Sequence, residues 1–235
     1  MSILITQHLG ETIDDACYRI AGELLREHGD HDQSTHGRKG GGITLQDFTN
    51  KLETRIDDAN KFANKEDVQR LKKVTSSVTG RMDEKTIARL DEGLKDVVVV
   101  NDGKQLTKML ADRGLVDADA GEISASYMIG AKAILVGSNM DGQPISEKRF
   151  QGIMSHEMMH AIDGGDQAIS GSTAWKEAWQ TEVKDSGKMT NYAATNPAEG
   201  LAEFGRLLWS TDIPREKVNA SFPKMVSVLE TEGVL

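Results

Sequence analysis

One short stretch, residues 153–163, constrains the fold and the chemistry of this chain more than any other, because it contains the pattern H-E-x-x-H. The histidines of the pattern are His156 and His160, and Glu157 directly follows the first of them. On a helix, residues four apart lie about 40° from each other around the axis, so both imidazoles project from one face. They can then take two adjacent positions on one metal ion. The stretch therefore predicts a helix that carries two metal ligands.

The residue types of this pattern favour zinc. Imidazole nitrogen suits zinc, and a catalytic zinc site keeps three protein ligands and leaves the fourth position to water. The metal lowers the pKa of that water to roughly 7, and a carboxylate beside it can accept its proton and later deliver it to a leaving amine. Glu157 is the carboxylate placed for this task. The pattern thus predicts the chemistry of a metal-dependent peptidase.

The alternative for a bare H-E-x-x-H is a solvated helix that carries two histidines by chance. The flanking residues favour the metal site, because Ser146 is an expected N-cap, Gly164-Gly165 ends the helix, and an apolar surface lies beside the histidines. That surface consists of Phe150, Ile153, Met154, Met158, Ala161 and Ile162. Such a helix is expected to be largely buried, and its imidazole and carboxylate groups then need partners.

A third ligand is expected from a carboxylate further along the chain. Asn196 and Pro197 are typical of an N-cap and a first helical position, which places Glu199 in the first turn of a helix. Glu203 follows one turn later on the same face. The alternative is that Glu199 folds back onto Asn196 as a capping-box residue, which leaves the aligned second carboxylate unexplained.

Three aspartates are weaker candidates for the third ligand, namely Asp163, Asp166 and Asp185. Asp163 lies on the metal helix itself, three residues past the second histidine. It is expected to act from outside the ligand shell, where it would hold either a ligand or a neighbouring loop.

These motifs resemble those of the gluzincin metallopeptidases, and within them the catalytic domain of the anthrax lethal factor type. The resemblance lies in H-E-x-x-H followed by a tyrosine seven residues before a glutamate in an N-P-x-E context. It implies that His156, His160 and Glu199 ligate zinc. It also implies that Glu157 is the general base and acid, and that Tyr192 donates a hydrogen bond to the oxyanion of the tetrahedral intermediate.

The same resemblance extends over residues 97–209, about half of the chain. It implies that Glu203 lies outside the ligand shell and orients a zinc histidine. The chain departs from the lethal-factor pattern at Met158-Met159, because a small residue or glycine often precedes the second histidine in that family. This departure leaves the zinc ligands in place.

The rest of the chain divides into segments of different composition. Residues 1–28 have the apolar spacing of an amphipathic helix, and residues 29–43 form a flexible linker rich in glycine and histidine. A second metal site in this linker is the alternative, but its glycine-rich flank supplies no rigid frame. Residues 44–96 show helical stripes, and residues 97–235 are expected to form the metallopeptidase domain.

The linker contains H-D-Q-S-T-H-G at residues 31–37, which resembles a segment of tailed-phage head-associated proteins. This short resemblance indicates a phage or prophage source. It implies phage head proteins as partners, besides a protein or peptide substrate. The N-terminal helices could also join copies of the chain into a homo-oligomer.

Strand patterns precede the metal helix. Residues 97–100 are a run of valines, typical of a buried strand, and residues 123–129 and 131–136 resemble two paired strands around Gly130. In zincins generally, a strand at the sheet edge beside the H-E-x-x-H helix pairs with extended substrate, and one of these two strands is expected to do so. Tyr127 then faces either the substrate cleft or the core.

Helices dominate the sequence after the metal helix. A helix from Ser172 carries an aromatic stripe, residues 185–191 form a loop that could act as a lid, and the glutamate helix runs to about Ser210. Pro214 opens a last helix. The predicted fold is therefore α+β and zincin-like, with a small sheet packed on the H-E-x-x-H helix and the glutamate helix.

Composition argues against other classes of protein. The net charge of −9 disfavours nucleic acid as a partner. No apolar run approaches the roughly 18 residues of a membrane span, and the N-terminus lacks the basic start and apolar core of a signal peptide. The host cytoplasm or a phage virion is then the expected location. A single cysteine, Cys17, excludes an internal disulfide.

The sequence thus predicts a zinc-dependent endopeptidase of gluzincin type. One alternative is a virion or head-associated structural protein that keeps a zincin fold. A purely structural zinc site has no need of a general base, so the presence of Glu157 argues against this alternative. The other is a toxin-like effector protease, which would share all of the chemistry and differ in its target.

Overall fold

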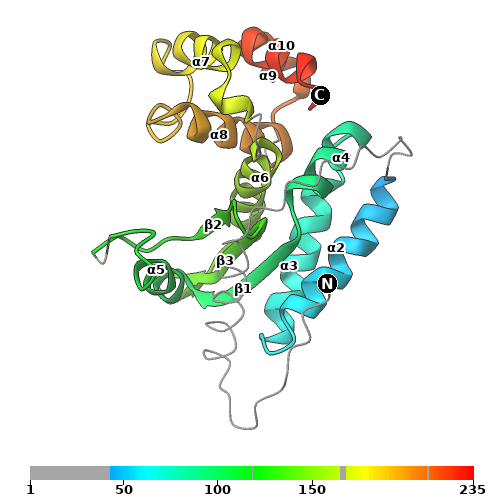
Figure 1. Ribbon diagram of the computed structural model, residues 1–235, viewed down its shortest axis with the longest axis vertical. Helices are drawn as coiled ribbons and strands as arrows, with labels where there is room; N and C mark the ends of the chain where they lie inside the picture. Colours follow the sequence, from blue (N-terminus) through cyan, green and yellow to red (C-terminus); the bar gives the residue numbers. More distant parts are fainter. Residues whose placement is uncertain (1–42, 118, 165–167, 211) are drawn as a thin grey trace.

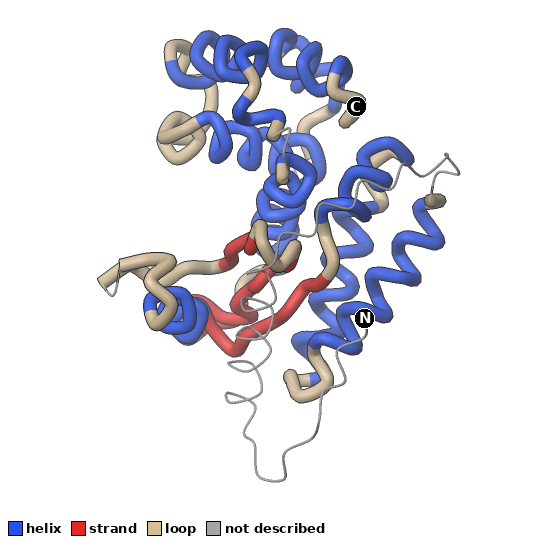
Figure 2. Tube along the Cα trace, viewed as in Figure 1, coloured by secondary structure: helices blue, strands red, loops and turns tan. Residues whose placement is uncertain are grey.

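The computed structural model describes residues 43–117, 119–164, 168–210 and 212–235, which form an α+β fold (Figures 1 and 2). The expected helix at residues 1–28 lies outside this part of the chain, as does the expected linker except for Ile43. Cys17 and Asp166 are also outside it. None of the helices within it combines the length and the apolar character that crossing a membrane requires.

The sheet is small and mixed. Its strands in the described chain are β1 (Asp96–Asp102), β2 (Ala125–Met128), β3 (Ala133–Met140) and β4 (Gln143–Pro144). β3 is central, with β1 parallel to it on one side and β2 antiparallel to it on the other, and β4 also pairs with β3. The prediction of two paired strands around Gly130 is confirmed, because β2 and β3 flank this glycine.

Strand β1 is buried on both faces. Val97 and Val99 belong to the main core, whereas Val98 and Val100 pack with α5 (Gly103–Ala111) in a second cluster. Successive side chains of a strand point to opposite faces, so a run of four valines fills both sides. Helix α5 accordingly covers one face of the sheet, and helices preceding the sheet cover the other (Figure 1).

The helices that precede the sheet are α2 (Leu45–Ala59), α3 (Lys65–Thr79) and α4 (Glu84–Gly93). Each of them begins at a side chain that accepts a hydrogen bond from a backbone N–H of the first turn, from Thr44, Asn64 and Asp83 respectively. Their apolar stripes belong to the same core as the helix that carries H-E-x-x-H, and α3 and α4 contact that helix directly.

The two edges of the sheet differ. At β1, the buried side chain of Asn60 donates from Nδ2 to the carbonyl oxygen of Val97 (2.8 Å) and accepts at Oδ1 from the N–H of Val99 (2.8 Å). Asn60 thus occupies groups that another strand would use. Every residue of β2 is only partly buried. The edge at β2 is therefore the more exposed one, although the backbone of Tyr127 in this strand hydrogen-bonds Glu157.

The C-terminal half of the chain is helical. Its elements are α6 (Glu147–Asp163), η1 (Ile169–Gly171), α7 (Thr173–Trp179) with a π-helical continuation η2 (Gln180–Lys184), α8 (Pro197–Ser210), α9 (Arg215–Ser221) and α10 (Pro223–Thr231). The prediction of one helix from Pro214 is wrong, because the structure has two. Phe222 leaves the helical conformation (φ −133°, ψ 55°), as expected for a residue before proline, and Pro223 starts α10.

Tyr127 of β2 faces the core, which is one of the two positions expected for it. Its hydroxyl donates to the carbonyl oxygen of Gly93 at the end of α4 (2.6 Å), and its ring packs against the main core. Burial raises the pKa of Tyr127 to about 12. The side chain therefore ties the sheet edge to α4.

Gly93 lets α4 approach α6 closely. A Cβ added at Gly93 would lie 1.9 Å from the backbone oxygen of Ala161 in α6, so the two helices would have to separate. We expect Gly93→Ala to lower the free energy of unfolding by about 1–3 kcal/mol, measured by urea denaturation. Gly121→Ala is the control, since nothing lies within 4 Å of a Cβ there. Equal stability of the two variants would contradict this packing.

Candidate metal centre

Helix α6 presents the two histidines. Ser146 begins the helix by accepting a hydrogen bond from the N–H of Arg149 (3.4 Å), and Gly164 ends it, as predicted. His156 and His160 lie one turn apart, and their Nε2 atoms are 3.2 Å from each other. Two imidazole nitrogens this close can share one proton in a hydrogen bond. Alternatively, both can direct a lone pair to the same cation.

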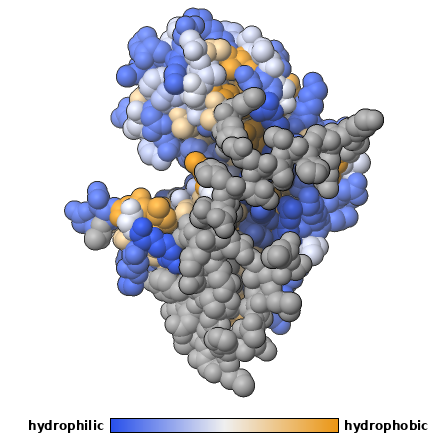
Figure 3. All heavy atoms as spheres, in the orientation of Figure 1, coloured by the Kyte–Doolittle hydropathy of each residue, from blue (hydrophilic) through white to orange (hydrophobic). Residues whose placement is uncertain are grey.

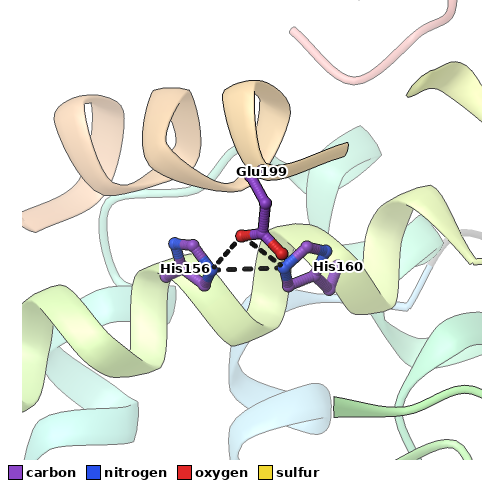
Figure 4. A group of neighbouring side chains, drawn as sticks. All are labelled: His156, His160 and Glu199. Carbon is purple, nitrogen blue, oxygen red and sulfur yellow. Dashed lines mark hydrogen bonds and ion pairs between the residues drawn. The ribbon is translucent and has the colours of Figure 1, made fainter. Parts of the chain in front are cut away.

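Helix α8 presents the carboxylate. Asn196 caps this helix, because its Oδ1 accepts hydrogen bonds from the N–H groups of Ala198 and Glu199 (both 3.0 Å). The side chain of Glu199 points toward the histidines of α6 instead of folding back onto this cap (Figure 4). Close packing of the two helices makes this reach possible, since a Cβ at Gly205 of α8 would lie 2.6 Å from Met159 Cβ of α6.

The three ligand atoms converge with the spacing of a metal site. Glu199 Oε2 lies 3.2 Å from His156 Nε2 and 3.6 Å from His160 Nε2, and the two nitrogens are 3.2 Å apart. A tetrahedral ion with bonds of about 2.0–2.1 Å separates its ligand atoms by about 3.3–3.4 Å. This group could therefore hold a metal ion without a large movement of any side chain.

Glu199 Oε2 is buried and makes no hydrogen bond with acceptable angles, although both imidazoles are near it. Burial alone would raise the pKa of Glu199, but the nearby His156 and His160, together with Tyr192, hold it well below its usual range. A buried carboxylate oxygen without a directed hydrogen bond is costly. A cation among the three ligand atoms would remove this cost, so the donor set fits a metal.

Glu203 orients one of the two histidines. Its Oε1 lies 3.1 Å from His156 Nδ1, and its carboxylate also accepts from Arg206 (3.3 Å) and from the hydroxyl of Thr190 (3.3 Å). Burial raises the pKa of Glu203, but the bond to His156 and the charge of Arg206 outweigh it and lower the pKa. An ionised Glu203 assigns the proton to Nδ1 and leaves the Nε2 lone pair for a metal.

The metal-free site retains a proton at neutral pH. Burial lowers the pKa of His156, but its hydrogen bonds to Glu199 and Glu203 outweigh burial and raise the pKa to about 9. A metal must displace that proton in order to bind, so its affinity should fall as the pH falls.

We expect Glu203→Ala to weaken zinc binding by about 10–100-fold, which is the usual effect of losing a partner that orients a metal histidine. Competition with a chromophoric chelator at pH 7.5 measures the affinity. Glu177→Ala, at an exposed glutamate of α7, is the matched control and should bind zinc as the wild type does. Equal affinities for the two variants would remove the orienting role of Glu203.

Glu157 lies beside the ligand group and is not one of the three. It is buried, with 7% of its surface exposed. Burial raises the pKa of Glu157, while the nearby His156 and His160 and a hydrogen bond from the backbone of Tyr127 lower it, and the net pKa is raised. The carboxylate is therefore a stronger base than that of an exposed glutamate.

Tyr192 lies beside the ligand group and is partly exposed. Its ring centroid is 5.9 Å from that of His156, and 53% of its surface is exposed. Burial of the hydroxyl raises the pKa of Tyr192, and the negative charge of Glu199, to which the hydroxyl hydrogen-bonds, raises it further. Tyr192 therefore stays protonated and can act as a hydrogen-bond donor.

The remaining sequence candidates lie elsewhere or serve the scaffold. Asp163 accepts hydrogen bonds from the backbone and the hydroxyl of Ser170, so it ties the end of α6 to η1. Asp185 accepts from the side chain of Gln180 (2.7 Å). The ligand group found among the described residues thus contains neither of these aspartates.

Two residues of the site were not predicted, namely Arg206 and Thr190. Arg206 lies three residues after Glu203 on one helix, a spacing that favours an ion pair, and this signal was available in the sequence. Thr190 lies in the loop expected at residues 185–191, but no signal singled it out, because its contact depends on how that loop folds onto α8.

No family model matches this chain, and no curated protein matches it.

Proposed function

We propose that this chain is a zinc-dependent endopeptidase of gluzincin type, with a zincin-like fold built around α6 and α8. The observation that carries the proposal is the buried Glu157 beside His156, His160 and Glu199. A purely structural metal site needs ligands alone, whereas a hydrolytic one also needs a base that is not a ligand. Two imidazoles and one carboxylate with an open fourth position favour zinc over other ions.

Zinc, when bound, would lower the pKa of a water molecule and polarise the carbonyl group of the scissile peptide. Glu157 then accepts a proton from the attacking water and delivers it to the nitrogen of the leaving amine. Tyr192 donates a hydrogen bond to the carbonyl oxygen as that oxygen gains negative charge.

The accessible edge of the sheet is the proposed place for the peptide. β2 pairs with β3 on one side, contacts α6, and has partly buried residues along its length. Figure 3 shows a hollow in the surface between the C-terminal helices and the end of the molecule that carries α5. A substrate segment in extended form would add to β2 by backbone hydrogen bonds, which favours unfolded or flexible protein segments.

Cleavage of an unfolded protein by the zinc-loaded chain tests this proposal. We expect fragments whose new ends are found by mass spectrometry, and we expect a chelator to stop their formation and added zinc to restore it. If the chain holds about one zinc ion but the substrate stays intact after prolonged incubation, the proposal is contradicted. The chain would then be a metal-binding protein without peptidase activity on such substrates.

A further inference from the structure

The hydroxyl of Thr190 connects the turn at residues 190–195, which carries Tyr192, to the metal centre. Thr190 Oγ1 donates to Glu203 Oε2 (3.3 Å) and accepts from the N–H of Ala193 (3.1 Å). The same oxygen therefore closes the turn and reaches the carboxylate that holds His156 Nδ1. These contacts form an unbroken path from the turn to a metal ligand.

The other side of the turn is held separately. The indole N–H of Trp179 donates to the carbonyl oxygen of Ala193 (2.9 Å), and Ala193 is fully buried. Thr195 donates from its hydroxyl to the carbonyl oxygen of Tyr192 (2.7 Å). Neither bond reaches Glu203. Of these three hydrogen bonds, only the one from Thr190 reaches Glu203, whereas the Tyr192 side chain meets His156 and Glu199 directly.

Packing alone does not fix the Tyr192 ring, because 53% of the residue is exposed. Its direction depends on the turn and on its neighbours His156 and Glu199. Ordering an exposed aromatic side chain costs conformational entropy, which a fixed turn reduces in advance.

We propose that Thr190 is a positioning residue, which couples the turn that presents Tyr192 to the metal ligand His156 through Glu203. A metal held by His156 would restrict the imidazole, and the Nδ1–H bond would then hold the Glu203 carboxylate as an acceptor for Thr190. The role of Tyr192 in hydrolysis rests on the proposed function, whereas the coupling is a property of the contacts. By thermodynamic linkage, a turn ordered by the metal must in return strengthen metal binding.

Hydrogen exchange of the Ala193 amide, followed by NMR with and without zinc, measures this coupling. In the wild type we expect zinc to slow the exchange by about 10-fold, within the usual 5–150-fold range of coupling. Thr190→Val should reduce the zinc effect to less than about 2-fold, and Thr190→Ser, which keeps the hydroxyl, should restore it. Thr190 is exposed, so valine opens no cavity.

Zinc affinity gives the reciprocal measurement. Thr190→Val should weaken zinc binding by the same factor of about 10 by which zinc slows the exchange. Thr195→Val is the matched control, because it removes an exposed threonine hydroxyl from the same turn but no contact to Glu203. It should keep both the zinc effect on exchange and the wild-type zinc affinity. Equal losses in the two valine variants, or none in Thr190→Val, would overturn the proposal.

A double-mutant cycle of Thr190 and Glu203, measured in the metal-free protein, keeps this test independent of the proposed function. Thr190→Val and Glu203→Ala should each speed exchange of the Ala193 amide, and the double variant should be no faster than the faster single one. Additive effects would refute the path, whether or not zinc binds. A chain that shows this coupling but cleaves no peptide would refute the peptidase and keep the coupling.

Discussion

Glu157→Gln is expected to lower the rate of peptide hydrolysis by about 10²–10⁴-fold, the usual contribution of a positioned general base. Glutamine keeps the shape of the buried side chain but cannot accept the proton of the attacking water. Glu157 is not among the three converging ligands, so zinc content should stay at the wild-type level. Initial rates on a fluorogenic peptide, paired with zinc analysis of the same samples, measure both quantities.

Glu147→Gln is the matched control for this experiment. Glu147 lies in the first turn of the same helix, is exposed, and pairs with Lys73 at the surface (2.8 Å). An exposed pair of this kind contributes little, so the control should keep the wild-type rate. Wild-type hydrolysis in Glu157→Gln would show that another group acts as the base.

Glu199→Ala is expected to weaken zinc binding by more than about 100-fold, beyond the range seen when a partner outside the ligand shell is lost. Its Oε2 is the carboxylate oxygen that both His156 Nε2 and His160 Nε2 approach. Without it, the two imidazoles alone would hold the ion. Competition with a chelator of known affinity measures the loss, and far-ultraviolet circular dichroism checks that the fold is kept.

Asp185→Ala separates this prediction from a general effect of removing acidic charge. Asp185 was a weaker candidate for the third ligand, and in the structure it bonds Gln180. Its variant should bind zinc as tightly as the wild type. Loss of zinc in Asp185→Ala with retention in Glu199→Ala would reverse the assignment of the third ligand.

Local signals predicted the parts of the structure that depend on neighbouring residues in the chain. The spacing of His156 and His160 needs only a helix, and Asn196 with Pro197 was enough to place Glu199 in a first turn. The valine run of β1 predicted a buried strand for the same reason, and the structure adds that both of its faces are covered. Pro223 was a local signal for the break between α9 and α10 that the prediction of a single helix overlooked.

Contacts between distant segments could not be predicted in this way. The reach of Glu199 to α6 depends on the close approach of two helices, which Gly205 allows. The contact of Thr190 with Glu203 depends on the path of a loop, and the bond of Tyr127 to Gly93 depends on where α4 ends. Hydrophobic periodicity identifies the faces of helices and strands, but it does not determine which faces meet.

Elemental analysis of the wild type and of His160→Ala, both purified without any chelator, tests the metal centre most directly. We expect about one zinc ion per chain in the wild type, because three ligands and one open position define a single site. The variant, with two of the three ligands left, should contain far less than one zinc per chain after dialysis. Absence of zinc from the wild type, or equal zinc in both proteins, would contradict a metal held by His156, His160 and Glu199.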